Sequence, residues 1–201
     1  MAQFKVKDFY FKKAKAEGYR SRAAYKIKEI IERQKLLKGA KRILDLGSAP
    51  GGFLQVLCEK ASASALIVGI DLKPVAPLGD PRITVFEGDA QDEKAQEKII
   101  AALGGKAQLI LSDMAPSTTG IREVDADRSL ELCQTAFEIA LKLLDEGGSL
   151  AMKIFESEEA VAFRNSMRVY FSEVKATRPD ATRKGSRELF IIARGFKSKN
   201  Q

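Results

Sequence analysis

The chain of 201 residues contains no histidine and only two cysteines. Without histidine, sites of the Ser-His-Asp, Cys-His and histidine–metal types are excluded, because each uses an imidazole as base or ligand. Cys58 and Cys133 are isolated and far apart, so they form neither a zinc motif nor a disulfide framework. This cysteine pattern is typical of a reducing compartment. We therefore expect a cytoplasmic protein without a metal site.

The sequence also lacks a long apolar run. No stretch approaches the ~20 residues that a membrane helix needs. Lys5, Lys7 and Asp8 place charge near the N-terminus, which leaves no apolar region of a signal peptide. We therefore expect no membrane partner. The length, the hydrophobic content of 45% and the absence of repeats suit a single domain over 1–201.

Acidic residues are scarce at the start of the chain. Residues 1–42 hold fourteen Lys or Arg against four Asp or Glu, whereas the remainder has a net charge of −3. A confined basic segment is the electrostatic pattern expected for binding the phosphates of a nucleic acid. The alternatives are a solubilising tail or a patch for an anionic membrane. We predict that the basic segment 1–41 packs on the domain and binds RNA.

From residue 42 onward, apolar runs alternate with helical patterns. Near-continuous apolar strands are typical of a parallel sheet that is covered on both faces. The alternation predicts an α/β fold of the Rossmann-like type, with a mostly parallel sheet and helices on both faces. Strands are predicted over 42–47, 65–71, 83–89, 107–113, 149–155, 172–177 and 188–196. Helices are predicted over 21–37, with Ser21 as a possible N-cap, and over 52–61, 92–103, 125–144 and 158–170.

Polar residues or a glycine turn follow five of these apolar runs. Because right-handed crossovers bring the carboxyl ends of parallel strands to one edge of the sheet, these positions are expected to lie together. A single Asp at such a place is an ordinary turn former, but several opposite a glycine turn indicate a shared ligand site. The positions are Gly47, Asp71, Asp89, Asp113 and Lys153.

The stretch LDLGSAPGGF, residues 44–53, decides which ligand this site suits. Its glycine spacing is not that of the dinucleotide fingerprint, and it lacks the Gly-Lys-Ser/Thr of a phosphate-binding loop. Asp71, at the end of the second strand, suits a ribose diol, and Asp89 suits an exocyclic amine. The helix that begins at Gly51 and Gly52 offers free amides to an anionic group. S-adenosylmethionine, with its adenine, ribose and carboxylate, fits these features best.

The chain resembles the FtsJ/RrmJ (RlmE) family of RNA ribose 2′-O-methyltransferases over nearly its full length. The resemblance rests on the stretches GYRSRAAYKIKEI, ILDLGSAPGGF, GIDL, EGDA, LILSDMAPSTTG, MKIF and SRELFIIA. It implies a class I S-adenosylmethionine-dependent methyltransferase with a seven-stranded sheet. It also implies that a Lys-Asp-Lys-Glu tetrad surrounds the target ribose. Matched by motif, these residues are Lys26, Asp113, Lys153 and Glu188.

The resemblance further implies cofactor contacts at Gly51, Phe53, Asp71, Asp89 and Asp113, to which the glycine turn adds Gly47 and Gly52. Phosphate contacts are expected from two basic clusters, one in the first 22 residues and one in RPDATRKGSR, residues 178–187. The RNA-binding residues expected from them are Lys12, Lys13, Arg20, Arg22, Arg183 and Lys184.

The resulting hypothesis is a monomeric enzyme that methylates a ribose, expected to be a uridine, in 23S ribosomal RNA, either free or in the large subunit. Lys153 is expected to act as the base, Asp113 to position it, and Lys26 and Glu188 to orient the ribose. One alternative is the same chemistry on a tRNA anticodon loop. Another is a non-catalytic RNA-binding assembly factor. A nicotinamide-dependent oxidoreductase is disfavoured by the glycine spacing and the missing histidine.

Overall fold

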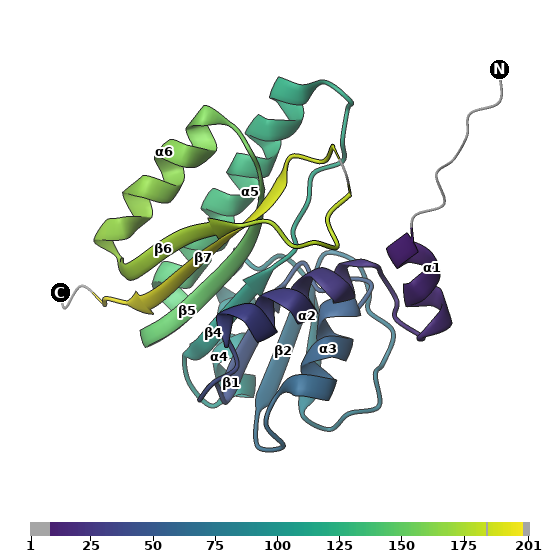
Figure 1. The fold of residues 1–201 in the computed structure, drawn as a ribbon. Coiled ribbons are helices and arrows are strands. Elements are labelled where there is room, and N and C mark those ends of the chain that lie inside the picture. Colours follow the sequence, from purple (N-terminus) through teal and green to yellow (C-terminus); the bar gives the residue numbers. More distant parts are fainter. Residues whose placement is uncertain (1–8, 184, 199–201) are drawn as a thin grey trace.

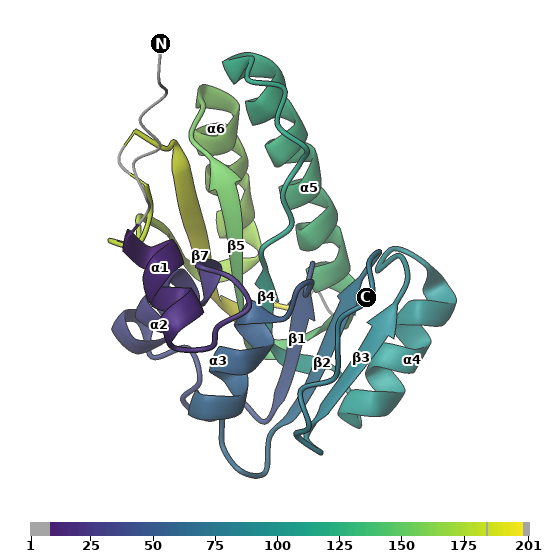
Figure 2. The same cartoon turned by 90° about the vertical axis from the view of Figure 1, so that its right-hand side faces the viewer.

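The computed structural model describes residues 9–183 and 185–198, within which seven strands form one sheet in the order β3-β2-β1-β4-β5-β7-β6 (Figures 1 and 2). The strands are β1 (Arg42–Leu46), β2 (Leu66–Asp71), β3 (Ile83–Glu87), β4 (Ala107–Ser112), β5 (Leu144–Phe155), β6 (Phe171–Thr177) and β7 (Glu188–Phe196). The helices are α1 (Phe9–Ala16), α2 (Ala23–Gln34), α3 (Gly52–Lys60), α4 (Glu93–Leu103), α5 (Arg122–Leu143) and α6 (Glu158–Ser166), with the 3-10 helix η1 (Met167–Val169).

The pairs formed among β1 to β5 are all parallel, whereas β7 is antiparallel to both β5 and β6. The predicted Rossmann-like, mostly parallel sheet with helices on both faces is therefore confirmed. β7 lies between β5 and β6, so the last strand of the chain is an interior one. This insertion brings the start of β7 beside the end of β5, which matters for the site described below.

Alternate residues of each strand pack against different helices, because side chains in a strand point to opposite faces. Ile43, Leu109 and Leu111 belong to the apolar cluster built with α2 and α3. Leu44 and Ile110 belong to the cluster built with α4 and α5. Figure 2 shows these two helical layers on either side of the sheet. We call the side covered by α2 and α3 the α2 face.

Local sequence signals explain several element boundaries. α2 buries Ala24, Ile27, Ile30 and Ile31, whose spacing places them on one helical stripe. α4 begins after Asp92, whose carboxylate accepts a hydrogen bond from the amide of Lys94 at 2.8 Å and so caps the helix.

Three features differ from the sequence-based predictions. α1 was not predicted, because an eight-residue helix with a short apolar stripe gives a weak periodic signal. α2 begins at Ala23 with Arg22 as its N-cap and without a side-chain cap, so Ser21 does not cap it. β5 begins at Leu144, directly after α5, five residues before the predicted start. In the described residues we find no helix with both the length and the apolar character to cross a membrane.

The N-terminal helices also contact the loop that joins β6 to β7. Ala14 of α1, Tyr25 of α2 and Ala181 of that loop form a small buried cluster. Arg22 strengthens this contact by donating a hydrogen bond to the carbonyl of Ala181 at 2.8 Å. α1 and α2 therefore lie next to the β6–β7 loop, which is far from them along the chain (Figure 1).

Candidate active site at the carboxyl ends of the strands

Three strands end at one level of the sheet, and β5 passes through the same level before it ends at Phe155. Leu46 of β1 is in register with Ile70 of β2 and Ser112 of β4, and Ser112 is in register with Met152 of β5. The next residue along each strand direction is Gly47, Asp71, Asp113 or Lys153. The sequence reasoning expected these four positions at one rim, and the register brings them into one row. Asp89 lies two residues beyond the end of β3 and is exposed.

Lys153 and Asp113 form an ion pair within this row. The Lys153 Nζ donates to the Asp113 Oδ1 at 2.7 Å and to the main-chain carbonyl of the same residue at 2.8 Å. The Lys153 side chain is 8% exposed and that of Asp113 is 21% exposed, so the pair is largely shielded from water. Two acceptors on one partner hold the amine in a defined position.

The strand beneath Lys153 is fixed from the opposite face. Cys133 of α5 donates a hydrogen bond from its Sγ to the carbonyl of Lys153 at 2.8 Å. Burial raises the pKa of the Cys133 thiol to about 12, although Lys153 acts in the opposite direction. The thiol is therefore neutral at physiological pH and serves as a donor rather than as a nucleophile.

Lys26 and Glu188 form a second ion pair, which joins α2 to the start of β7. The Lys26 Nζ donates to the Glu188 Oε1, and the side chains are only 9% and 12% exposed. In the β5–β7 ladder, Phe155 is opposite Glu188 and Lys153 is opposite Phe190. Glu188 is thus the diagonal neighbour of Lys153 on the same face, at a typical Cα separation of about 7–8 Å.

The two ion pairs therefore lie together on the α2 face of the rim. Lys26 and Glu188 also line a hollow of about 220 Å³, together with Arg22, Arg183 and Ser186. Burial, followed by the positive charge of Arg183, lowers the pKa of Arg22, whereas Glu188 raises it. The hollow has two arginines and a lysine on its walls, which suits an anionic ligand such as a phosphate.

The glycine turn after β1 is held by Asp71. Its Oδ2 accepts a hydrogen bond from the Ala49 amide at 2.9 Å, and its Oδ1 accepts one from the Lys73 amide at 2.9 Å. Gly47 has φ 72°, and a Cβ there would lie 2.8 Å from the side chain of Met114. Each carboxylate oxygen of Asp71 keeps a lone pair for a further donor, such as a ribose hydroxyl.

Phe53 lies in the core and not at the rim. Its side chain is 3% exposed and belongs to the cluster beneath α2. The structure therefore does not bring the Phe53 ring to the site, and only the backbone at this position could reach a ligand. Gly51 and Gly52 are buried as well, because Arg20 and Ser21 cover them.

Asp45 belongs to the stretch of residues 44–53 but is not among the cofactor contacts expected above. Its side chain is fully buried two residues before Gly47, and neither carboxylate oxygen has a hydrogen-bond partner within the described residues. The nearby Ser48 hydroxyl is in the same condition. Burial, and then the charges of Asp113 and Asp71, raise the pKa of Asp45 well above its ordinary value. These oxygens are acceptors available to a donor group of a bound molecule.

The basic residues expected to bind RNA fall into different environments. Lys12 is exposed on α1, whereas Lys13 lies 4.9 Å from the centre of the Tyr25 ring and 3.8 Å from Glu17. Arg22 and Arg183 line the hollow beside Glu188. Arg20 differs from the expectation, because its guanidinium donates to three main-chain carbonyls. Lys184 lies outside the described residues.

Comparison with known proteins gives this arrangement a context. A relative from Novosphingobium aromaticivorans named ribosomal RNA large subunit methyltransferase E is 45% identical over 194 residues, covering 96% of this chain and 86% of its own. The protein of the same name from Methanothermobacter thermautotrophicus is 38% identical over 195 residues, covering 97% and 92%.

Solved structures show the same fold. A crystal structure described as a ribosomal RNA methyltransferase from Plasmodium falciparum matches with a TM-score of 0.78 and 27% identity, over 89% of this chain and 98% of its own. Fibrillarin from Aeropyrum pernix, solved with bound S-adenosylmethionine, matches with a TM-score of 0.58 and 19% identity, over 87% and 75%. The family model of the FtsJ-like methyltransferases matches residues 19–196. This chain belongs to the FtsJ-like methyltransferase family.

Proposed function

We propose that this protein transfers a methyl group from S-adenosylmethionine to a ribose 2′-hydroxyl, that of a uridine, in the 23S RNA of the large ribosomal subunit. The observation that carries the proposal is the meeting of two lysine–carboxylate pairs, Lys153 with Asp113 and Lys26 with Glu188, at one edge of the sheet. The names of the relatives supply the ribosomal RNA substrate. Since such RNA is made into ribosomes in the cytoplasm, the protein would work there, as a monomer.

The residues around the glycine turn fit the cofactor. The Asp71 carboxylate would accept hydrogen bonds from the ribose diol. The exposed Asp89 carboxylate would accept hydrogen bonds from the adenine amine. The backbone of the turn from Gly47 to Phe53 would hold the methionine part, where α3 begins without a side-chain cap on its leading amides. The unpartnered oxygens of Asp45 and Ser48 could accept hydrogen bonds from the amino group of the methionine part. Asp113 would border the cofactor. When bound, the cofactor supplies an electrophilic methyl group.

The two ion pairs would divide the work on the ribose. With the Lys153 amine in its neutral form, both of its N–H groups would be donated to Asp113, and its lone pair would be left for the 2′-hydroxyl. Lys153 would take the proton that this hydroxyl loses, and Asp113 would keep the amine in place. Lys26 and Glu188 would hold the ribose through its neighbouring oxygens. Their low exposure strengthens these contacts because water does not compete for them.

The RNA would approach over α2 and the loop between β6 and β7. Arg22 and Arg183 line the hollow beside Glu188 and would bind the phosphate next to the target ribose. Lys12 and Lys13 of α1 would extend this contact, and Lys184 belongs to the same proposal.

The test is transfer of a labelled methyl group from S-adenosylmethionine to purified large subunits, free 23S RNA and tRNA, followed by nuclease mapping. We expect one ribose 2′-O-methylated uridine in the large-subunit RNA. Methylation confined to tRNA would contradict the substrate. Binding of RNA without any methyl transfer to these three substrates would support an assembly factor instead.

A further inference from the structure

Arg20 is an arginine of the basic N-terminal segment whose donors are used inside the protein. Its Nη1 donates to the carbonyls of Pro50 at 3.2 Å and Ala76 at 2.6 Å, and its Nη2 donates to the carbonyl of Pro77 at 2.8 Å. Pro50 belongs to the glycine turn, whereas Ala76 and Pro77 belong to the loop between β2 and β3. One side chain therefore joins two segments that flank the proposed cofactor site.

The backbone around Arg20 is fastened to α3 as well. The Arg20 amide donates to the Gln55 Oε1 at 2.7 Å, and the Gln55 Nε2 donates to the carbonyl of Gly18 at 2.9 Å. Gln55 lies in the first turn of α3, directly after the glycine turn. The N-terminal segment thus contacts the start of α3 through both side chain and main chain.

The two adjacent glycines of the turn are explained by this contact. A Cβ on Gly51 would lie 2.7 Å from the Arg20 Nη1, and a Cβ on Gly52 would lie 2.3 Å from the Ser21 Oγ. Both distances are shorter than a van der Waals contact, so a Cβ at either position would displace the Arg20 or Ser21 side chain from its place against the turn. The sequence suggested a ligand cradle here, but the N-terminal segment is what lies against these two glycines.

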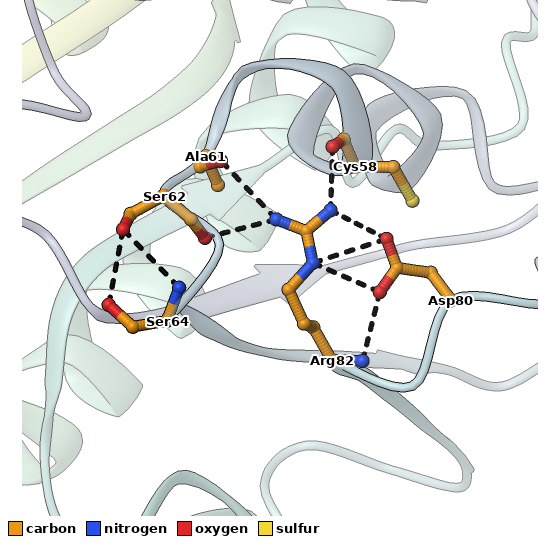
Figure 3. A network of polar contacts seen from close by, with 6 residues as sticks. All are labelled: Cys58, Ala61, Ser62, Ser64, Asp80 and Arg82. Atoms are coloured by element: carbon orange, nitrogen blue, oxygen red, sulfur yellow. Dashed lines mark hydrogen bonds and ion pairs between the residues drawn. The ribbon is translucent and has the colours of Figure 1, made fainter.

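The loop between β2 and β3 is held at its other end by Arg82. Its guanidinium pairs with Asp80 at 2.6 Å and donates to the carbonyls of Cys58, Ala61 and Ser62, at and just beyond the end of α3 (Figure 3). The hydrogen bonds that Asp80 accepts from the guanidinium and the amide of Arg82 lower its pKa to about 2. Val75 and Leu78 pack this loop against the apolar cluster of the α2 face, and Arg20 adds the hydrogen bonds that join its Ala76–Pro77 part to the turn.

We propose that Arg20 is a positioning residue that holds the glycine turn and the β2–β3 loop in the arrangement that binds S-adenosylmethionine. This inference rests on the proposed function, because it requires the cofactor to lie at that turn. It assigns to Arg20 a different role from that of Arg22, two residues later, which lines the hollow beside Lys26 and Glu188. Through Arg20, docking of the N-terminal segment and binding of the cofactor favour each other.

The test compares R20K and R20Q with wild type and with R168Q, a control at an exposed arginine on η1. Lysine keeps the charge but cannot form the planar fork that reaches three carbonyls, so both Arg20 variants are expected to fail alike. We expect the Kd of S-adenosylmethionine, measured by calorimetry, to rise by about tenfold because the binding-competent arrangement becomes less populated. The slope of log K for 23S RNA fragments against log salt concentration should stay unchanged.

Two results would overturn the inference. In the first, R20Q binds the cofactor with an affinity within about twofold of wild type, and its slope of log K for RNA against log salt concentration is lower by about 0.7–0.9. Such a decrease in slope corresponds to the loss of one phosphate contact. The other is recovery of wild-type affinity by R20K. If both Arg20 variants fail to fold, the variant Q55L replaces them, because it removes the hydrogen bonds that fasten the same segment to α3. Q55L should weaken cofactor binding. Unchanged binding by Q55L would refute the inference. Failure of the wild-type protein to bind S-adenosylmethionine would instead contradict the proposed function.

Discussion

The two lysine–carboxylate pairs at the rim are built in different ways. Lys153 and Asp113 come from adjacent strands of one sheet, and the amine contacts both the carboxylate and the main chain of its partner. Lys26 and Glu188 come from a helix and a strand, so this pair depends on how α2 docks on the sheet. The comparison suggests that the proton-handling group belongs to the rigid sheet, while the group that orients the substrate belongs to the layer that RNA approaches.

The largest expected effect is on the first pair. K153A should lower the rate of methyl transfer by a factor of about 10² to 10⁴, the usual contribution of a positioned acid or base. The Kd of S-adenosylmethionine should change by no more than about twofold, because the variant removes a group that acts on the ribose. Single-turnover transfer of labelled methyl to 23S RNA and calorimetry measure the two quantities.

The control for this experiment is K106A. Lys106 is exposed and precedes β4 at the opposite end of that strand. The K106A variant should transfer methyl groups at the wild-type rate. Wild-type turnover by K153A would contradict the role of Lys153 and remove the distinction between the two pairs.

A smaller effect is expected from the second pair. E188Q keeps the shape of the side chain but removes the charge that holds Lys26, so the ribose should bind less precisely. We expect the methyl-transfer rate to fall by about 10- to 100-fold, as for a small misplacement of a reacting group. The KM for RNA should rise while cofactor affinity is retained, which steady-state kinetics with each substrate varied in turn will show. A loss as large as that of K153A would erase the difference between the pairs.

Stability measurements test whether the pairs are separate units. Double-mutant cycles on the free energy of unfolding should give coupling of about 1–3 kcal/mol within each pair, as expected for residues in direct contact. The diagonal combination of Lys153 with Glu188 should give about 0.5 kcal/mol or less. Urea unfolding of the single and double variants K153M, D113N, K26M and E188Q supplies the values. Diagonal coupling as strong as that within a pair would show one network of four residues.

Asp45 is linked to the first pair only, because burial and then the charge of Asp113 raise the pKa of Asp45. The folded state retains a proton on Asp45 that the unfolded chain releases above its ordinary pKa of about 4. Stability is thus complete at lower pH and falls as pH rises toward the raised folded pKa, by about 1.4 kcal/mol per unit. D45N should remove this loss, so its stability relative to wild type should grow with pH in urea unfolding. Parallel curves for the two proteins would contradict the shift.

Much of the fold and part of the site could be predicted from the sequence. Apolar runs end where strands end, so Asp71, Asp113 and Lys153 could be placed at one rim from topology alone. The involvement of Lys26 and Glu188 could not be predicted in this way, since it depends on how α2 docks and on the insertion of β7 between β5 and β6. The family resemblance, and not spacing, indicated these two residues.

Other features leave no signal in a single sequence. Arg20 and Arg22 are two residues apart and chemically identical, yet Arg20 joins the glycine turn to the β2–β3 loop, whereas Arg22 donates to the carbonyl of Ala181 and lines the hollow beside Glu188. Every residue has a main-chain carbonyl, whatever its side chain. The sequence therefore does not indicate which carbonyls Arg20 contacts. Similarly, Phe53 follows the glycine turn in sequence, but the rotation of α3 directs its side chain into the core.

In the proposed reaction Lys153, and not Lys26, receives the proton of the ribose hydroxyl. The most direct measurement is the pH dependence of single-turnover methyl transfer in wild type, K153R and K26R, because arginine keeps the positive charge but cannot accept a proton. We expect the rate to rise with pH in wild type and K26R, and we expect K153R to be slow and to lose this rise. A K153R enzyme with the wild-type rate and pH profile would contradict this role of Lys153.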